Sequence, residues 1–254
     1  MAGELAALSI LAHPDDAEFV CAGTLTLLSQ KGWRIHIATM TPGNCGSAVL
    51  GPDEIAAIRR EEGAHAAAVL DGEYHCLESE DCFIRHDKPT MLKTIGLIRQ
   101  VAPTVIFTAS PSDYLYDHEA TSLIGRDATF WSSVPNIKTD GVEPLSSIPY
   151  LYYCDPLDCE DILGEPVEPK TVVDISSVIE TKVEMLTRHA SQRDWLLKQH
   201  GTDEYVAAMK NMGRKRGRQI HAEFAEGFRQ HLGNAYPKDD ILSAEIGSLV
   251  HGIQ

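Results

Sequence analysis

The sequence predicts an α/β fold in which a mostly parallel, doubly wound sheet is followed by a C-terminal helical layer. Short apolar runs typical of buried strands alternate with longer helical patterns through the first half of the chain. Two long helical stretches, 176–199 and 202–231, follow in the second half. With 254 residues, 43% of them hydrophobic, the chain is long enough for one large domain. We therefore expect a single domain over 1–254, with an α/β core in 1–160 and a mainly helical part in 161–254.

Five segments carry a strand pattern, because each is short, rich in apolar or β-branched residues, and bounded by loop residues. They are 5–12, 33–40, 74–77, 104–109 and 149–156. Parallel strands place their carboxyl ends at one edge of a sheet, and the ligand sites of such folds lie there. If 150–153 lies at the side of the sheet, its aromatic residues form a candidate surface for a homo-oligomer.

Helical patterns separate the first four of these strands, at 19–31, 53–70 and 90–101. The first carries leucines on its inward side. The second has Asp53 and Glu54 in its first turn, where they complement the helix dipole, and alanines over much of its length.

The charge balance argues against two classes of partner. Lys and Arg number 22 against 37 Asp and Glu, which gives a formal net charge of -15. Such an acidic surface repels nucleic-acid phosphates and anionic lipid head groups. The basic cluster 210–218 is the exception, and a charge run of this kind is usually a solvated face.

Compartment and redox state follow from what the sequence lacks. No apolar run approaches the length of a membrane span, and the first residues have no secretory pattern, so we expect a cytoplasmic protein. The six cysteines show no CxxC spacing and are expected to be buried or free thiols.

One loop concentrates the residue types of a metal site. His13, Asp15, Asp16 and Glu18 follow directly after the first apolar run. A hydrolytic zinc typically takes about three protein ligands from His and carboxylate groups and keeps one position open for water. His13 and Asp16 are spaced so that both can face one ion, which leaves Asp15 free to point at the bound water. The third ligand has to come from elsewhere.

The loop after the strand 104–109 supplies a second cluster of acidic and histidine residues, at 113–118. In a parallel sheet both loops open on the same edge, so His118 can complete the site. A plainer interpretation is equally open: Asp15 or Asp16 caps the following helix, and His118 is an ordinary surface histidine.

Taken together, these motifs resemble those of the PIG-L/LmbE family of zinc deacetylases. The resemblance rests on AHPDDAE after the first strand, TPG and GS after the second, Arg59-x-x-Glu62, and the pair Asp117–His118. It extends residue by residue over the first half of the chain, and in outline over the second through HASQ at 189–192. It implies a Rossmann-like single domain that removes an acetyl or similar acyl group from an amine, commonly on an N-acetylglucosamine-type sugar.

The resemblance also implies roles for individual residues. The metal, zinc with Fe²⁺ as an alternative, is implied to bind His13, Asp16 and His118. Asp15 is implied to be the general base, and Asp117 to orient or electrostatically support its neighbours. For Glu18, which matches the glutamate of the motif, we expect a supporting contact behind the metal ligands.

One position departs from the family pattern. Many members carry a histidine that assists the oxyanion or the leaving group where this sequence has Leu115, which can do neither. Tyr114, Tyr116 and His189 each offer an O–H or N–H donor for that role, although a tyrosine in such a loop more often serves packing.

Three further residues are candidates for substrate contacts. Arg59 lies on a helix that the resemblance places near the pocket, although an arginine on such a helix is usually solvated or ion-paired. Asn44 and Ser47 follow the second strand and either line the site with hydrogen-bond donors or form a plain turn. Cys45 in the same loop has no flanking histidine, and a hydrolytic site of this type does not need a thiolate, so we do not expect Cys45 to be the nucleophile of the hydrolysis or a metal ligand.

Two other functions compete with hydrolysis: a non-hydrolytic Rossmann-like nucleotide-binding protein and a metal-bearing binding module. The first is disfavoured because the first strand leads into HPDDAE and not into a GxGxxG turn. The second is disfavoured because structural zinc sites are usually closed by a full set of Cys or His ligands. We therefore expect a small acylated amine, an N-acetyl sugar above all, as the partner, and neither nucleic acid nor membrane.

Overall fold

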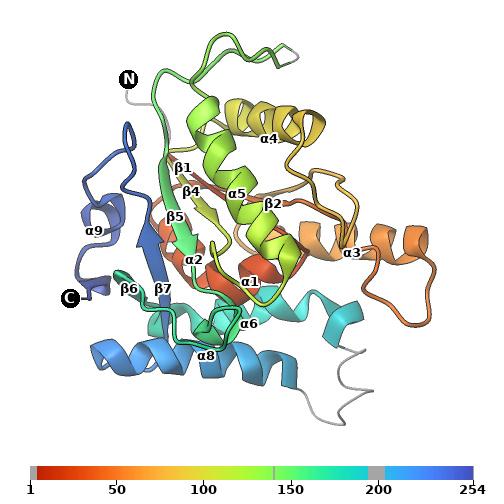
Figure 1. Ribbon diagram of the computed structural model, residues 1–254. Helices are drawn as coiled ribbons and strands as arrows, with labels where there is room; N and C mark the ends of the chain where they lie inside the picture. The colour runs from red at the N-terminus through yellow and green to blue at the C-terminus, as the bar shows by residue number, and fades with distance from the viewer. Residues whose placement is uncertain (1–4, 140, 194–203, 254) are drawn as a thin grey trace.

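The chain folds around one eight-stranded sheet, and the computed structural model describes residues 5–139, 141–193 and 204–253 (Figure 1). The strands are β1 (Ala6–Leu11), β2 (Arg34–Thr39), β3 (Glu73–Cys76), β4 (Val105–Thr108), β5 (Tyr150–Cys154), β6 (Thr171–Asp174), β7 (Ala225–Gln230) and β8 (Val250–Gly252). Their order across the sheet is β3-β2-β1-β4-β5-β7-β6-β8.

The strands from β3 to β5 form the parallel part of the sheet. β1 lies at its centre, where Ala7 is opposite Ile35 on β2 and Val105 on β4. The α/β fold with a mostly parallel sheet is therefore confirmed. The bounds of each predicted strand differ from the observed bounds by at most two residues. The loops after β1 and β4 open on the same edge because these neighbouring strands are parallel.

The rest of the sheet comes from the C-terminal part of the chain. Besides its helices, the part 161–254, predicted to be mainly helical, adds β6, β7 and β8 in antiparallel pairings. The predicted helix 202–231 is wrong beyond Ile220, because the chain turns back there and continues as β7. Gly217 permits the turn: a Cβ at this position would meet the Ala222 carbonyl oxygen at 2.6 Å. β5 lies between β4 and β7, so 150–153 is not a side strand.

Helices cover both faces of the sheet. They are α1 (Asp16–Val20), α2 (Ala22–Gln30), α3 (Pro52–Ala68), α4 (Lys88–Val101), α5 (Tyr116–Trp131), α6 (Ile179–Thr187), α8 (Glu204–Ile220) and α9 (Ile241–Ile246), with short 3-10 turns at Leu157–Cys159, Ser176–Val178 and Gly247–Leu249. α4 and α5 pack on one face, and the other helices pack on the opposite face (Figure 1). Of the predicted helix 176–199, positions 194–199 lie outside the described residues, as do 202–203.

Alternate residues of the central strands divide between two apolar cores. Phe107 on β4 and Tyr152 on β5 point into the core beneath α2 and α6, with ring centroids 5.9 Å apart. Ile106 and Leu151 point into the core beneath α4 and α5. Burial on both faces explains why these strands are apolar throughout and why they could be predicted from the sequence.

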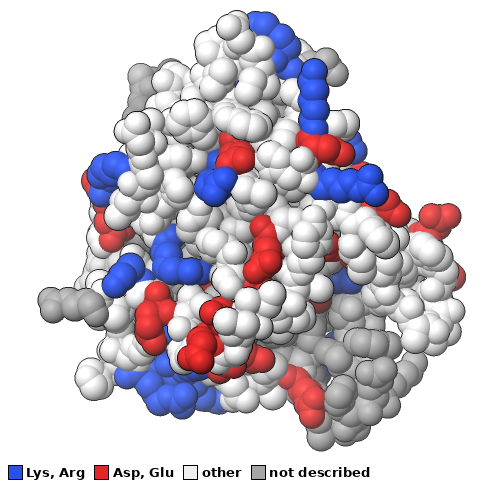
Figure 2. Space-filling view, in the orientation of Figure 1, with Lys and Arg blue, Asp and Glu red and all other residues white. Residues whose placement is uncertain are grey.

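The basic cluster 210–218 lies on α8, and its side chains bind partners on the same molecule. These pairs are Lys210–Glu180, Arg214–Asn211, Lys215–Glu160 and Arg216–Asp155. Figure 2 shows basic side chains gathered at the lower left, where Figure 1 places α8, with acidic side chains beside them. Among the described helices, none has the length and apolar character needed to cross a membrane.

Candidate metal centre and active site

The loop between β1 and α1 sets up the site. Asp15 has φ 108°, a backbone conformation that L-residues rarely adopt, so the chain turns sharply before α1 begins at Asp16. The Asp16 Oδ2 atom accepts hydrogen bonds from the backbone N–H groups of Ala12 (3.1 Å) and His13 (2.8 Å). Those bonds fix the Asp16 carboxylate at the carboxyl end of β1.

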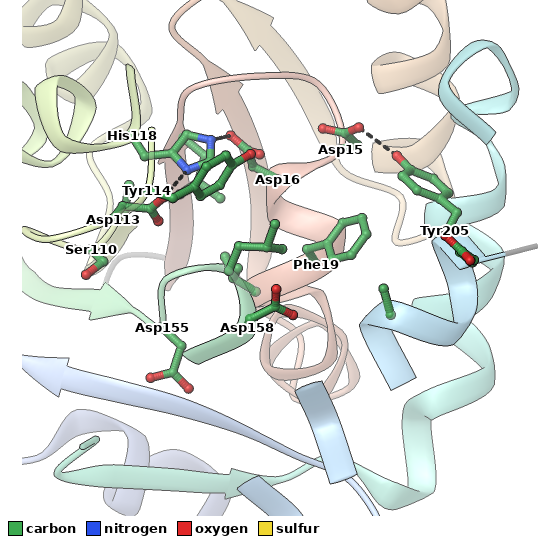
Figure 3. Close-up of a pocket in the computed structure, with 16 residues that line it drawn as sticks. Asp15, Asp16, Phe19, Ser110, Asp113, Tyr114, His118, Asp155, Asp158 and Tyr205 are labelled. Atoms are coloured by element: carbon green, nitrogen blue, oxygen red, sulfur yellow. Dashed lines mark hydrogen bonds and ion pairs between the residues drawn. The ribbon is translucent and has the colours of Figure 1, made fainter. Parts of the chain in front are cut away.

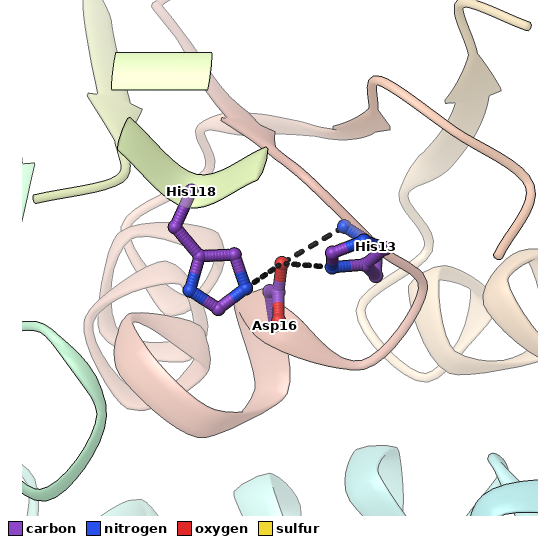
Figure 4. Close-up of side chains that lie close together, drawn as sticks. All are labelled: His13, Asp16 and His118. Carbon is purple, nitrogen blue, oxygen red and sulfur yellow. Dashed lines mark hydrogen bonds and ion pairs between the residues drawn. The ribbon is translucent and has the colours of Figure 1, made fainter. Parts of the chain in front are cut away.

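Two histidines converge on this carboxylate. The Asp16 Oδ2 atom lies 3.5 Å from His13 Nδ1 and 3.5 Å from His118 Nε2 (Figure 4). His118 comes from the first turn of α5, which follows β4, so the two loops meet as the parallel sheet predicts. One donor atom from each of the three side chains lies within 4.8 Å of the others.

The outer nitrogen of each imidazole contacts a carboxylate. His118 Nδ1 lies 2.9 Å from Asp113 Oδ1, while His13 Nε2 lies 3.0 Å from Asp81 Oδ1 and 3.3 Å from Asp117 Oδ2. If the outer N–H groups donate to these acids, the inner nitrogens beside Asp16 would be free to bind a metal. This is the arrangement in which carboxylates orient metal-bound histidines.

The donor set fits a divalent transition metal. It consists of two imidazole nitrogens and one carboxylate oxygen, and the two rings are tilted with centroids 5.4 Å apart. Burial acts to raise the pKa of Asp16, but His118, His13 and the backbone donors outweigh it and hold that pKa well below its usual range. Asp16 is therefore ionised, as a metal ligand must be.

Asp15 is held next to this cluster by two groups from distant parts of the chain. Its Oδ2 atom accepts a 2.6 Å hydrogen bond from the Tyr205 hydroxyl, and its Oδ1 atom lies 3.5 Å from Arg59 Nη2. Burial raises the pKa of the Asp15 carboxyl; Arg59 opposes the rise and the charge of Asp16 adds to it. A carboxylate with a raised pKa is better suited to accept a proton near neutral pH.

A cavity of about 390 Å³ opens onto these groups (Figure 3). Carboxylates and aromatic rings dominate the wall: Asp15, Asp16, Asp113, Asp155, Asp158, Glu204, Phe19, Tyr114 and Tyr205. His118 lines it as well, with Ser110 at the end of β4 and a few aliphatic side chains. Among the described residues that line the cavity, none is Lys or Arg.

Comparison with known proteins relates the first half of the chain to a protein family. The family model described as PIG-L: GlcNAc-PI de-N-acetylase matches residues 8–129, which include all three metal-ligand candidates. The chain contains a PIG-L family domain. The eight-stranded fold around that domain is shared with a solved N,N'-diacetylchitobiose deacetylase from Pyrococcus horikoshii, with TM-score 0.76, 24% identity, and coverage of 89% of this chain and 83% of that one.

Two curated proteins resemble the chain beyond the PIG-L domain. The 4-oxalmesaconate hydratase of Pseudomonas putida is 25% identical over 88% of this chain and 88% of its own length. The diacetylchitobiose deacetylase of Thermococcus kodakarensis is 25% identical over 73% of this chain and 69% of its own length.

Of the candidates for the role left open by Leu115, the structure brings one to the cavity beside the candidate metal centre. Tyr114 lines it and meets the His118 ring edge to face at 5.5 Å. The Tyr116 hydroxyl instead donates to the Ile84 carbonyl. His189 is fully buried with its Nε2 atom 3.4 Å from Glu18 Oε2, so the supporting contact of Glu18 is with His189.

The remaining substrate candidates have structural partners. Arg59 is buried and donates to the Pro14 and Gly43 carbonyls, so it braces two loops of the PIG-L domain. Ser47 accepts hydrogen bonds from the next turn of backbone, as in the plain-turn interpretation. Asn44 is partly exposed in the same loop.

Sequence reasoning missed several residues of the site. Asp81 and Asp113 orient the histidines, and Tyr205 holds Asp15. Asp113 stands in the cluster at 113–118, so its position after β4 was an available signal. Tyr205 bonds to a residue 190 positions away, and nothing local in the sequence indicates that contact.

Proposed function

We propose that the protein is a zinc-dependent hydrolase that removes the acetyl group from an N-acetylated amino sugar. The observation that carries the proposal is the common cavity onto which Asp16, His118 and Asp15 open, with His13 completing the donor set. The PIG-L domain and the 25% identity to a diacetylchitobiose deacetylase support the same reaction.

His13, Asp16 and His118 would hold the metal, with Fe²⁺ as the alternative to zinc. A bound zinc ion supplies Lewis acidity, which makes water a stronger acid and polarises an amide carbonyl. Three protein ligands leave room for water and substrate on the cavity side, unlike a closed structural zinc site. The donor set therefore favours catalysis over a binding module.

Asp15 acts as the general base in this proposal. It takes a proton from the attacking water while the new C–O bond forms at the amide carbon. It then returns the proton to the nitrogen as the C–N bond breaks, so that acetate and a free amine leave. Tyr205, donating to Asp15 Oδ2, keeps the carboxylate in one orientation through both proton transfers.

Tyr114 takes the role that Leu115 leaves vacant. It is the one of the three proposed donors that lines the cavity, and its ring contacts His118 (Figure 3). Burial and the neighbouring acids raise the pKa of Tyr114 to about 12, so it keeps its proton and can donate to a developing oxyanion.

The charge of the cavity favours a neutral, hydroxyl-rich substrate. Asp158 at the far end can accept hydrogen bonds from sugar hydroxyls, and Phe19 offers an apolar face, whereas the Asp155 carboxylate is paired with Arg216. The carboxylates of the cavity repel organic acid anions. 4-Oxalmesaconate, for which the hydratase relative is named, is such an anion. The same carboxylates equally disfavour a nucleotide, because its phosphates are negative.

The test is to incubate the zinc-loaded protein with N,N'-diacetylchitobiose and to measure acetate and primary amine together. The proposal predicts equal amounts of both, and loss of both when Asp15→Asn replaces the base. Release of neither product by the metal-loaded protein from diacetylchitobiose or N-acetylglucosamine would contradict the sugar deacetylase assignment. Hydration of 4-oxalmesaconate in a parallel assay would favour the hydratase relative instead.

A further inference from the structure

Two exposed thiols meet beside the candidate metal centre. Cys45 lies in the loop between β2 and α3, and Cys82 lies in the loop between β3 and α4. Their Sγ atoms and a carboxylate oxygen of Asp81 all lie within 4.8 Å of one another. Free cysteines are usually buried, so two exposed thiols this close together are unusual.

The main chain of both cysteines is tied to the acids that orient His13. The Cys45 N–H donates to Asp81 Oδ2 at 2.8 Å, and the Cys82 N–H donates to Asp117 Oδ2 at 2.7 Å. Asp81 and Asp117 are the two carboxylates that contact His13 Nε2. A change in the relative position of the two cysteines is therefore transmitted to Asp81 and Asp117, the two carboxylates that hold His13, a proposed metal ligand.

We propose that Cys45 and Cys82 form a redox-active pair that closes to a disulfide and thereby alters the hold on His13. Neither thiol takes part in the hydrolytic reaction, so this role goes beyond the proposed function. Both residues lie in loops outside the helices and strands, where the backbone can adjust as the sulfur atoms move to bonding distance.

A low-molecular-weight disulfide such as oxidised glutathione supplies the oxidant. The Cys45 thiolate attacks one of its sulfurs and releases one glutathione thiolate, which leaves a mixed disulfide on Cys45. The Cys82 thiolate then attacks the Cys45 sulfur and releases the second glutathione thiolate. The two protein thiols are oxidised, the glutathione disulfide is reduced, and the two protons pass to the released thiolates.

The reverse order, in which Cys82 attacks first and Cys45 resolves the mixed disulfide, gives the same cross-link and the same balance. Partial desolvation and the neighbouring Asp81 and Cys45 raise the pKa of Cys82 to about 11.

A second pair of cysteines serves as an internal control, because its two thiols are close together but not accessible to solvent. Cys21 and Cys154 also contact each other, and both are fully buried. Burial raises the pKa of Cys21 well above its usual value, so this pair resists oxidation by a bulky disulfide. Selective reaction of the exposed pair would reflect accessibility as well as proximity.

The first experiment equilibrates the purified chain in glutathione buffers of increasing oxidation, quenches with acid, alkylates free thiols and maps the peptides by mass spectrometry. We expect a Cys45–Cys82 cross-link, lighter by two hydrogen atoms, that dithiothreitol reverses, while Cys21 and Cys154 stay reduced. Cys45→Ser and Cys82→Ser lose the cross-link, whereas the matched variant Cys76→Ser on β3 keeps it. Separate glutathione adducts on Cys45 and Cys82, or unmodified thiols in the most oxidising buffer, would overturn the proposal.

The second experiment tests the link to His13 and rests on the proposed metal site. Zinc dissociation constants are measured for the reduced and the cross-linked protein by competition with a chelating dye. We expect cross-linking to weaken binding by about tenfold, as other disturbances behind a metal ligand do, and Cys45→Ser to show one constant in both buffers. Equal constants for reduced and cross-linked wild type would overturn the coupling. Neither readout uses deacetylation, so failure of the sugar assay would not be confused with failure here.

Discussion

Asp113 fixes the orientation of His118, and its contribution can be measured directly. It accepts from His118 Nδ1 at 2.9 Å and also binds the Leu115 N–H, so it joins the ligand to the start of α5. We predict that Asp113→Asn weakens zinc binding by about 10- to 100-fold, because the amide can present its N–H to the imidazole and favour the wrong tautomer. Zinc titration of the apoprotein measures the effect.

The control for this substitution is Asp127→Asn. Asp127 forms the same kind of carboxylate–imidazole pair with His86, at 3.0 Å, away from the site. Its loss is predicted to leave the zinc dissociation constant unchanged. Equal weakening by both variants would mean that any loss of charge disturbs the protein, and that Asp113 has no special role.

Asp15 and Tyr205 make separable contributions to turnover. We predict that Asp15→Asn lowers kcat by about 10² to 10⁴-fold, the range expected for loss of a general base, with zinc still bound. Tyr205→Phe keeps the base and loses its 2.6 Å hydrogen bond, so a smaller fall in kcat is expected. Deacetylation rates with metal content determined on the same samples test both; a larger loss for Tyr205→Phe than for Asp15→Asn would contradict the assignment of the base.

Predictability at the residue scale depended on distance along the chain. The cluster at 13–18 could be found because its metal-type residues are contiguous and follow an apolar strand. Asp81 contributes to the same site from a loop with no metal-type spacing, and Tyr205 reaches Asp15 across 190 positions. Such partners are determined by the tertiary fold.

At the scale of elements, strands β2 and β3 carry a histidine pair that links stability to pH. His36 Nδ1 lies 3.1 Å from His75 Nε2, and the rings stack with centroids 5.4 Å apart. Burial lowers the pKa of both imidazoles below the ordinary value. As the pH falls through that ordinary value, the unfolded chain takes up protons that the folded chain does not, so the folded state loses stability.

We predict that His75→Gln reduces the loss of unfolding free energy between about pH 7.5 and pH 5.5. Other histidines, His13 and His118 among them, have raised pKa values and shift stability in the opposite direction, so the comparison is between wild type and variant. Urea unfolding at both values of pH provides the measurement. A variant that loses as much stability as the wild type would show that the pair does not contribute.

Elements with a local signal were predicted, and those formed by long-range pairing were missed. β1, β2 and β4 are largely apolar because both faces of the sheet are covered there. β7 includes Gly227 and the charged Glu226, and it follows a long helical pattern, so the sequence favoured continuation of the helix. Its antiparallel partners β5 and β6 determine that it is a strand. α5 was also missed, although Asp117 and Glu119 mark an acidic first turn.

At the scale of the whole molecule, Glu226 joins three elements behind the site. It accepts from the Gly23 and Thr24 N–H groups at the start of α2 and pairs with Lys182 of α6 at 2.5 Å. All of these groups are buried, so removal of the carboxylate leaves the Lys182 ammonium without its counter-ion, and the two backbone N–H groups and the Thr24 hydroxyl without their acceptor.

We predict that Glu226→Ala lowers the free energy of unfolding by about 3 to 5 kcal/mol. Replacing both partners, as Glu226→Leu with Lys182→Met, is expected to recover part of that loss, because no charge is then left unpaired. Chemical denaturation of the three proteins gives the values. A double variant as unstable as Glu226→Ala would point to lost packing at α2 as the main cost.

The most direct test of the central claim is the amount of metal bound per chain, determined by elemental analysis of protein purified without chelator. We predict about one zinc or iron ion per wild-type chain and nearly complete loss in His118→Ala. A wild-type protein that binds no metal even after remetallation, or a His118→Ala protein that keeps its full complement, would contradict the three-ligand centre and with it the proposed hydrolysis.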